Sequence, residues 1–446
     1  MLTAQRESVV DMRLLERLSE ARRRSDALFE IVRPEGMYDR PIPERHRIIF
    51  YVGHLEAFDW NLLHEHALGL RSFHPDLDRL FAFGIDPVGG GLPTDQPSDW
   101  PSLDRVRDYA RMVRSVLDEQ LARVDSMDAH RRGGFSLETL LNVAIEHRLM
   151  HVETLAYMLH QLPLNRKVHP PLPSRVLASP VQHSMLKIPS GSVRLGLSRA
   201  SGEFGWDNEF ESHTKHVPRF QVDRYMVSNQ QFLDFIGDGG YENRGLWSDR
   251  DWEWKAAGDI SSPVFWTKSS GNWMYRTMFD EIPLPLDWPV YVSHAEASAF
   301  ARWTGRALPT EEQWERAAYG APDGSQREYP WGSDVPSPQR GNFDFASWDP
   351  TPVNAHPRGC SAFGVEGMLG DGWEWTSTVF GPYPGFEPFP FYRGYSADFF
   401  DGKHFVMKGG SARTAACMLR STFRNWFQSQ YQYVYAGFRC VSNSEE

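Results

Sequence analysis

The chain has 446 residues, which is long for a single hydrophobic core, so two domains are expected. It is 41% hydrophobic and 24% charged, as in a globular protein, and it contains no apolar run of about 18 residues that would predict a membrane span. The formal net charge of -11 argues against a broad nucleic-acid-binding surface.

The N-terminal residues and the cysteines predict the compartment. Residues 1–24 are charged and have no apolar segment followed by a cleavage site, so no secretory signal is expected. Cys360, Cys417 and Cys440 are too few for a disulfide framework and lack CxxC spacing, so we expect buried, inert thiols. These features predict a cytoplasmic protein, a monomer or small homo-oligomer, with no membrane or nucleic-acid partner.

Residues from about 8 to 162 have the pattern of helices. Apolar residues recur at helical spacing from Val9 to Leu28, with charged residues between them. Further helices are predicted at about 44–68, 103–124 and 136–161. Ser136, after a Gly-Gly break, is the expected N-cap of the last one. Four long helices predict a bundle over residues 1–162, whose core is a natural place for a metal site.

Residues 163–183 are rich in proline and show no amphipathic period, which predicts an interdomain linker. An irregular strap packed on one domain is the alternative. From residue 184 to 446, short apolar stretches alternate with Gly, Pro, Asn and Asp, and most of the 16 tryptophans lie here. Only about 293–304 and 310–319 are predicted to be clear helices, so the fold class is α+β, with a loop-rich second domain of short strands.

Three histidines of the first domain form a candidate metal site. His147 and His151 are four residues apart and project from one face of the fourth helix, and His54 lies among apolar residues of the second. Three imidazoles suit Fe(II), Zn(II), Ni(II) or Cu(II) and leave open positions, as catalytic sites do. Hydrogen-bonded core histidines are the alternative, and Glu146 and Glu153 are either partners that orient the rings or solvent-facing charges.

The sequence also resembles known families. GHLEAFDW and EHRLMHVETLAYML resemble the DinB-like bundle, in which histidines at these places bind a divalent metal. Most of residues 184–446 resemble the formylglycine-generating-enzyme-like (sulfatase-modifying-factor) fold, a relative of C-type lectins. The matching stretches are VDRYMVSNQQFLDF, WPVYVSHAEASAFARWTGRALPTEEQWERAAYG, YPWG, GDGWEWTST, KGGSARTA and YAGFRC. In this order the two domains resemble the iron-dependent sulfoxide synthases of ergothioneine biosynthesis, a family that includes selenoneine synthases.

This resemblance implies that His54, His147 and His151 hold Fe(II), which uses O2 to join a thiol to C2 of the imidazole of hercynine, Nα-trimethylhistidine. FRNWFQ is similar to the RNW or RNF segment that lines the hercynine site of the family, which implies that Asn425 contacts hercynine and that Trp426 lies near it. A trimethylammonium group is bound by aromatic faces, which Trp426 and Phe427 can supply, with core packing as the alternative.

Other substrate contacts are also implied. Glu153 and Met150 occupy positions where the family contacts the substrate imidazole, and Glu153 is preferred because it can accept a hydrogen bond. The family members that use gamma-glutamylcysteine tend to carry Asp and Arg where this chain has Phe427 and Tyr431. Free cysteine is therefore the expected donor, and a selenosugar, as in the selenoneine synthases, is the alternative. The three cysteines do not reproduce the reactive pair of formylglycine-generating enzymes.

A phenol is expected to deliver a proton during C–S bond formation. Tyr109 is the first candidate, with Tyr395 the next, and Tyr383 and Tyr392 are further candidates from the same aromatic segment. Arginines near the candidate site are expected to bind a substrate carboxylate. These are Arg111 or its neighbours Arg107 and Arg114, and Arg424 or Arg420.

Two other functions fit parts of the sequence. A DinB-like thiol transferase or hydrolase would use Zn(II) without O2, and a lectin-related module would bind a ligand without chemistry. FRNWFQ and the whole second domain argue against the zinc enzyme.

Overall fold

The computed structural model describes residues 12–84, 92–123, 135–169 and 181–443. The chain divides into two compact units, residues 1–171 and 172–446, and each unit is described by itself. The division lies inside the segment predicted to be a linker. None of the described helices has both the length and the apolar character of a membrane span.

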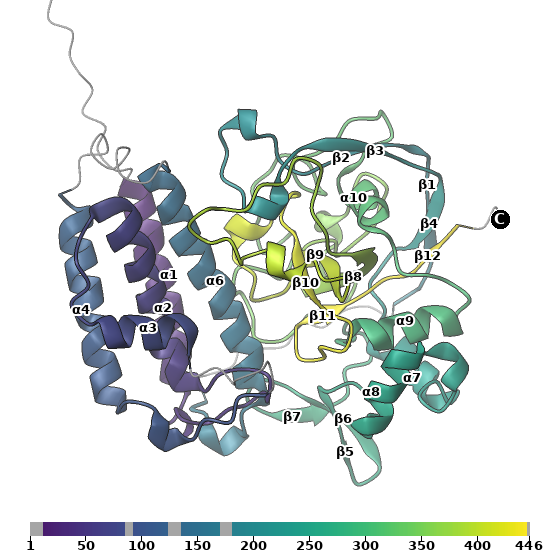
Figure 1. Cartoon of the computed structure of the whole chain (residues 1–446). Coiled ribbons are helices and arrows are strands. Elements are labelled where there is room, and N and C mark those ends of the chain that lie inside the picture. The colour runs from purple at the N-terminus through teal and green to yellow at the C-terminus, as the bar shows by residue number, and fades with distance from the viewer. Residues whose placement is uncertain (1–11, 85–91, 124–134, 170–180, 444–446) are drawn as a thin grey trace, which may run out of the picture. The chain divides into compact units, whose positions relative to one another are not determined.

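The first unit is a helical bundle (Figure 1). Its described helices are α1 (Met12–Ile31), α2 (Ile48–Leu63), α3 (Pro75–Phe83), α4 (Leu103–Leu121) and α6 (Leu137–Gln161). Helix α1 packs on α6, and α2 packs on α3, α4 and α6. The four long helices predicted from the sequence are confirmed, and Ser136 caps α6 by accepting a hydrogen bond from the backbone N–H of Thr139.

Two details of the bundle differ from the prediction. The segment predicted as one helix over 44–68 is helical only from Ile48, and it ends in a π-helical turn, His64–Leu68. Helix α3 was not predicted, because nine residues are too few to show a clear amphipathic period. Its start nevertheless carries ordinary signals, namely Pro75 in the first turn followed by acidic residues.

The beginning of the predicted linker is a strap on the bundle. Lys167 is fully buried and forms an isolated β-bridge with Val32. The Lys167 ammonium donates to the backbone carbonyl of Leu159, and the Val168 N–H donates to Ile31. Residues 163–169 therefore belong with the helices, whereas 170–180 lie outside the described residues.

The described residues of the second unit form four small sheets (Figure 1). Two have three strands: β1 (Met185–Ile188), β4 (Phe220–Asp223) and β12 (Val441–Ser442), and β5 (Trp266–Ser269), β6 (Asn272–Arg276) and β7 (Glu281–Pro283). The largest has the order β10 (Asn425–Gln428), β9 (His404–Gly410), β8 (Gly372–Val379) and β11 (Ala436–Gly437). Strands β2 (Gly191–Leu195) and β3 (His213–Val217) form a hairpin. Strand β10 is at an edge, so its outer side is not paired within the sheet.

The helices of this unit begin at Ser or Thr residues whose side chains cap them. The two predicted helices are confirmed as α9 (His294–Trp303) and α10 (Glu311–Tyr319), capped by Ser293 and Thr310. Helices α7 (Asn229–Gly237) and α8 (Asp249–Ala257) were not predicted. A capping serine precedes each, so the same local signal was present in the sequence.

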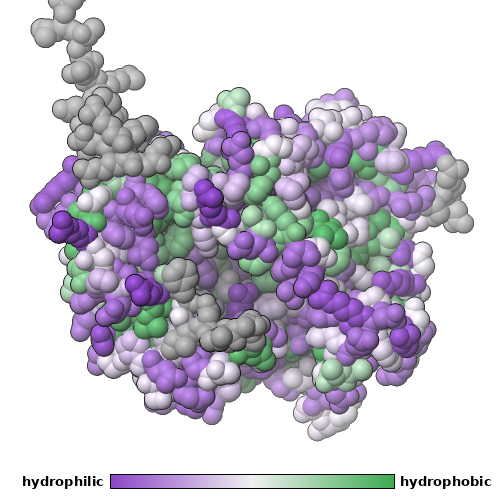
Figure 2. Space-filling model, viewed as in Figure 1, coloured by the Kyte–Doolittle hydropathy of each residue, from purple (hydrophilic) through white to green (hydrophobic). Residues whose placement is uncertain are grey.

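Large aromatic side chains and buried ion pairs hold the second unit together. Arg439 and Glu374 are both fully buried and form a two-bonded ion pair of 2.6 and 2.8 Å. The Trp375 indole donates to the backbone carbonyl of Val292. On the visible face of this unit, hydrophilic side chains predominate and hydrophobic ones are scattered between them (Figure 2). The aromatic residues therefore serve mainly as core, as the sequence predicts.

The three cysteines are free. Cys440 is buried, and burial raises the pKa of its thiol well above the ordinary value. Cys360 and Cys417 are partly exposed, so the expectation that all three are buried is wrong for these two. Cys360 directly follows the short 3-10 helix Pro357–Gly359, and Cys417 lies in the short 3-10 helix Ala416–Met418. Such connecting segments between core strands commonly lie at the surface.

His294 makes the stability of the second unit depend on pH. Its buried ring stacks on Phe405 at 3.7 Å, and burial lowers the pKa of His294 to about 3. Protonation thus favours the unfolded chain, and the stability present above pH ~6.5 is lost as the pH falls toward the folded pKa. Between pH 7.5 and 5.0 this residue alone is expected to lower the free energy of unfolding by about 2 kcal/mol.

Denaturant titrations followed by tryptophan fluorescence at both pH values measure this effect. His294→Gln is expected to lose about 2 kcal/mol less than the parent chain between the two pH values. Equal losses in the two proteins would contradict this assignment.

Candidate functional site

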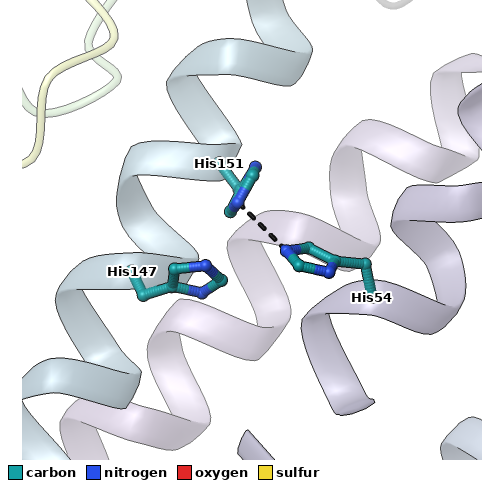
Figure 3. Close-up of side chains that lie close together, drawn as sticks. All are labelled: His54, His147 and His151. Atoms are coloured by element: carbon teal, nitrogen blue, oxygen red, sulfur yellow. Dashed lines mark hydrogen bonds between the residues drawn. The ribbon is translucent and has the colours of Figure 1, made fainter. Parts of the chain in front are cut away.

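His54, His147 and His151 meet inside the helical bundle (Figure 3). His147 and His151 extend from adjacent turns of α6, and His54 faces them from α2. Their candidate ligand atoms all lie within 4.8 Å of one another, and the Nε2 atoms of His54 and His151 are 3.2 Å apart. The sequence-predicted grouping of these three residues is therefore present in the structure.

The backbone of α3 orients His54. The Nδ1 of His54 lies 2.6 Å from the carbonyl oxygen of Phe81, which can only accept, so Nδ1 carries the proton. The lone pair of this ring is therefore on Nε2, which points toward His151. A carbonyl that fixes the tautomer of a histidine in this way is typical of metal ligands.

Aromatic rings fix the other sides of the cluster. Phe58, one turn after His54 on α2, stacks on the His147 ring at 3.4 Å with an interplanar angle of 11°. Phe50 stacks on His54 at 4.7 Å, and Tyr51 lies 5.7 Å from His151. The rings thus have apolar walls, and their nitrogen atoms converge on one another.

Burial keeps the imidazoles neutral. It lowers the pKa of His54 to about 4 and holds the pKa values of His147 and His151 well below the ordinary value. Neutral imidazole is the form that binds a metal ion, so near pH 7 no proton has to leave before binding.

The donor set fits a divalent transition metal. Metal–nitrogen bonds of about 2.0–2.1 Å place neighbouring ligand atoms about 3 Å apart, close to the 3.2 Å between His54 and His151. Among the described residues, the buried Nδ1 of His151 has no hydrogen-bond partner. Without an ion, His151 has to donate its Nε2 proton to His54, because otherwise two lone pairs would face each other. A bound ion would let both nitrogen atoms point their lone pairs at the metal.

Gly53 permits the close packing that orients His54. A Cβ atom at Gly53 would lie 2.4 Å from the ring of Phe81, so Gly53→Ala is expected to displace α3 and its carbonyl. We expect a lower Tm and metal binding weakened by about 10–100-fold, measured by titration with Co(II).

The matched control is Gly237→Ala, on helix α7, where an added Cβ meets nothing within 4 Å. It is expected to leave metal binding unchanged. Adding Phe81→Leu to Gly53→Ala should relieve the clash and restore part of the affinity. Full affinity in the single Gly53 variant would show that α3 does not position His54.

The tyrosine and arginines predicted on the third long helix, α4, have structural partners. The buried Tyr109 hydroxyl donates to Asp78 at 2.6 Å, and burial and this bond raise its pKa well above the ordinary value. Arg111 is exposed and pairs with Asp108, and Arg107 is exposed. Arg114 binds both Asp26 and Glu56. This arrangement favours structural roles for these residues.

Glu146, Met150 and Glu153, which the sequence predicts to orient the histidines or to contact the substrate, lie on α6 with His147 and His151. Glu146 and Glu153 are buried, so the alternative that they are solvent-facing charges is wrong. Met150 is half-buried. The contact of Glu153 and Met150 with a substrate stays a prediction, as does a role of Glu146 or Glu153 in orienting the histidine rings.

The predicted hercynine residues lie on the edge strand β10. Asn425, Trp426 and Phe427 pair with residues of β9, and neighbouring side chains of a strand point to opposite faces. Trp426 stacks on Phe380 at 4.2 Å and contacts Tyr395 at 5.4 Å. Trp426 thus lies on one face and its two neighbours on the other, so the structure brings Tyr395 to Trp426 but does not gather all three strand residues on one face.

Phe427 and Tyr431, the two positions that bear on the donor, contact each other. Their rings stack at 4.9 Å with an interplanar angle of 13°. Both side chains are half-buried. The two positions at which this chain differs from the family members that use gamma-glutamylcysteine therefore form one local aromatic pair.

The arginines that flank β10 are held by buried carboxylates. Arg424 forms two hydrogen bonds with Glu311, at 2.9 and 3.1 Å, and its guanidinium lies over Tyr383. Arg420 binds Glu209. The Tyr383 hydroxyl also donates to Glu311. Arg424 as a substrate-carboxylate ligand is therefore disfavoured, because its hydrogen bonds are already used in the core.

Of the remaining tyrosines, Tyr395 is buried and stacks on Trp206 at 4.0 Å. Tyr392 lies 5.4 Å from it, and burial raises the pKa of Tyr392 to about 12. Tyr395 is the tyrosine of this segment that contacts a predicted hercynine residue.

Sequence reasoning missed several residues around the histidines. Phe58, Gly53, Phe81 and Arg148 did not enter the prediction, although the first two stand within four positions of His54. The i,i+4 spacing of His54 and Phe58 was a readable signal. The carbonyl of Phe81 was not, because it depends on the packing of α3.

Comparisons with known proteins agree with the two-domain organisation. Residues 17–155 match the DinB superfamily, and residues 174–444 match the sulfatase-modifying factor enzyme 1-like domain. Over 343 residues the chain is 37% identical to "Hercynine oxygenase" of Mycobacterium tuberculosis, covering 75% of this chain and 77% of that protein. It is 35% identical to the protein of the same name from Mycolicibacterium smegmatis, covering 82% of this chain and 83% of that one.

A fungal relative is more distant. The chain is 27% identical to "Ergothioneine biosynthesis protein 1" of Neurospora crassa, which it matches over 91% of its own length and 55% of the relative. The predicted fold, a DinB-like bundle followed by a formylglycine-generating-enzyme-like domain, is confirmed. With this order of domains and these relatives, the chain belongs to the sulfoxide synthase family of ergothioneine biosynthesis, to which the hercynine oxygenases belong.

Proposed function

We propose that this protein is a non-haem iron oxygenase that uses O2 to join a thiol donor to C2 of the hercynine imidazole, giving a sulfoxide. The observation that carries the proposal is the cluster of three neutral histidines, whose nitrogen atoms converge in a member of this family. Hercynine is the substrate named for the relatives, and the residues proposed to act on it belong to this chain.

The histidine cluster supports iron as the metal. Three imidazoles leave coordination positions open, as an ion that binds substrates requires. Bound Fe(II) would supply a site for the donor sulfur and electrons to O2. Zn(II) can bind sulfur as well, but it has no redox chemistry and cannot supply the electrons. His54, His147 and His151 would hold the ion, and the carbonyl of Phe81 keeps the His54 lone pair directed at it.

We assign the hercynine contacts to β10. A ligand along the free edge of this strand can touch residues of both faces, so Asn425, Trp426 and Phe427 can contribute together although their side chains alternate. Trp426 and Phe427 would hold the trimethylammonium group by their aromatic faces, and Asn425 would hydrogen-bond a polar group. On α6, Glu153 would accept from the substrate imidazole, with Met150 beside the ring.

The Phe427–Tyr431 pair supports cysteine as the donor. Two stacked aromatic rings offer no charged partner for the amino and carboxylate groups of a glutamyl moiety. Free cysteine lacks the additional glutamyl amino and carboxylate groups, and a selenosugar, the donor of a selenoneine synthase, lacks them too. Parallel reactions with cysteine and with a selenosugar distinguish these two donors.

Tyr395 is our candidate for the proton donor. The hydroxyls of Tyr109 and Tyr383 donate to Asp78 and Glu311, and a proton transfer from either would have to break that bond. Tyr395 contacts Trp426, so it lies beside a residue assigned to hercynine.

The decisive experiment supplies Fe(II), O2 and hercynine with cysteine, gamma-glutamylcysteine or a selenosugar in parallel reactions, and identifies products by mass. The proposal expects a cysteine adduct at the sulfoxide level, with O2 uptake that depends on hercynine. A selenium adduct alone would make the protein a selenoneine synthase. Tightly held zinc, no O2 uptake and no hercynine adduct would refute the oxygenase and favour a DinB-like thiol transferase.

A further inference from the structure

Arg148 connects the two helices that carry the histidines. It directly follows His147 on α6, and its side chain is fully buried. Its guanidinium donates to the backbone carbonyl of Leu55 at 2.8 Å and to Glu56 at 2.9 Å, the two residues that follow His54 on α2. A third bond, of 2.6 Å, reaches Asp59 one turn further along α2.

The same guanidinium reaches a third helix. Its Nη1 lies 3.2 Å from the hydroxyl of Ser25 on α1. On the other side of Glu56, Arg114 of α4 forms a 2.7 Å ion pair with the same carboxylate oxygen that Arg148 binds. The four long helices of the bundle therefore meet in one buried network next to the histidines.

The charges of this network favour a fixed geometry. Arg148 and Arg114 both bond to the same oxygen of Glu56, and Arg148 also bonds to the carboxylate of Asp59. Buried charges of opposite sign in a planar, two-bonded arrangement hold their partners at a defined distance and angle.

We infer that Arg148 is a positioning residue for the metal site, because it fixes the spacing and register of α2 against α6 where His54 faces His147 and His151. A network that served only to stabilise the bundle could attach anywhere along the helices. This one attaches at residues adjacent in sequence to a ligand on each helix, so any slip between the helices at this point also moves the ligand atoms. This inference rests on the proposed metal site and names Arg148 as the residue that sets the geometry of the three histidines.

The test is Arg148→Lys in the full-length protein, with Co(II) as the probe. Lysine keeps the charge, but its ammonium cannot reproduce the planar fork that reaches Leu55, Glu56 and Asp59. We expect Co(II) affinity to fall by about 10–100-fold and the visible absorption spectrum of the bound Co(II) to change, because ligand spacing changes. The thermal unfolding of the metal-free proteins is measured in parallel.

Arg22→Lys is the matched control. Arg22 is also a buried arginine of this bundle, and its ion pair is with Asp118 of α4. It acts on α2 through the effect of its charge on Asp59, and lysine keeps that charge. Arg22→Lys is expected to lower the Tm of the metal-free protein and to leave Co(II) affinity and spectrum as in the parent chain. If Arg148→Lys does not fold, Arg148→Gln combined with Asp59→Asn removes one charge of each sign and is expected to show the same loss of affinity and changed spectrum.

The Co(II) measurements distinguish a failure of the metal site from a failure of the role of Arg148. A parent chain that binds no Co(II) would overturn both the metal site and the role of Arg148. A parent that binds Co(II), with Arg148 variants that match its affinity and spectrum, would overturn the role of Arg148 alone. A loss of affinity with a changed spectrum in the Arg148 variants, absent from Arg22→Lys, would support it.

Discussion

His147→Ala is expected to abolish iron binding and to lower the rate of product formation by about 10³-fold or more. His147 is one of three converging candidate ligands, and its ring is buried against Phe58. With two ligands the site loses both affinity and the geometry that directs the open positions. The measurements are the iron content of the purified protein and hercynine-dependent O2 uptake.

The loss should be local to the site. The second unit has its own core, so its tryptophan fluorescence and unfolding transition should match those of the parent chain. His216→Ala, at an exposed histidine of β3, is the matched control and should keep both iron and activity. Retention of iron by the His147 variant would refute the ligand assignment, whatever the activity.

Conversion of Phe427 to Asp together with Tyr431 to Arg is expected to move the donor preference toward gamma-glutamylcysteine. These two side chains stack on each other, so an Asp and an Arg placed there would be close enough to hold the amino and carboxylate groups of a glutamyl moiety. Hydrogen bonds to charged groups contribute about 1.5–3 kcal/mol, which corresponds to a change of about 10–100-fold in the ratio of kcat/KM for the two donors.

The control is a double change to leucine at the same two positions. It removes the aromatic stack without adding charge, so it should not improve use of gamma-glutamylcysteine. Steady-state kinetics with both thiols at saturating hercynine provide the ratio. If the charged variant and the leucine variant give the same ratio, these positions do not select the donor.

The sequence determined the features that depend on neighbours along the chain. The pairing of His147 with His151 follows from 3.6 residues per turn, and the capped start of their helix follows from Ser136. The motifs of both domains were also readable, since they are local strings of residues. For the same reason the two short helices α7 and α8 had detectable signals in their capping serines, although they were not predicted.

Only the tertiary structure decided which side chains are available for chemistry. Tyr109 and Arg424 are sensible candidates by residue type, but their partners, Asp78 and Glu311, lie 31 and 113 positions away. Likewise, Arg148 reaches Glu56 across 92 positions. Helical periodicity predicts which face of a helix is buried, but it does not predict which distant group that face meets, because that depends on how the helices pack. The sequence therefore identified the three candidate ligands, and the packing of α2, α3 and α6 decided how their nitrogen atoms converge.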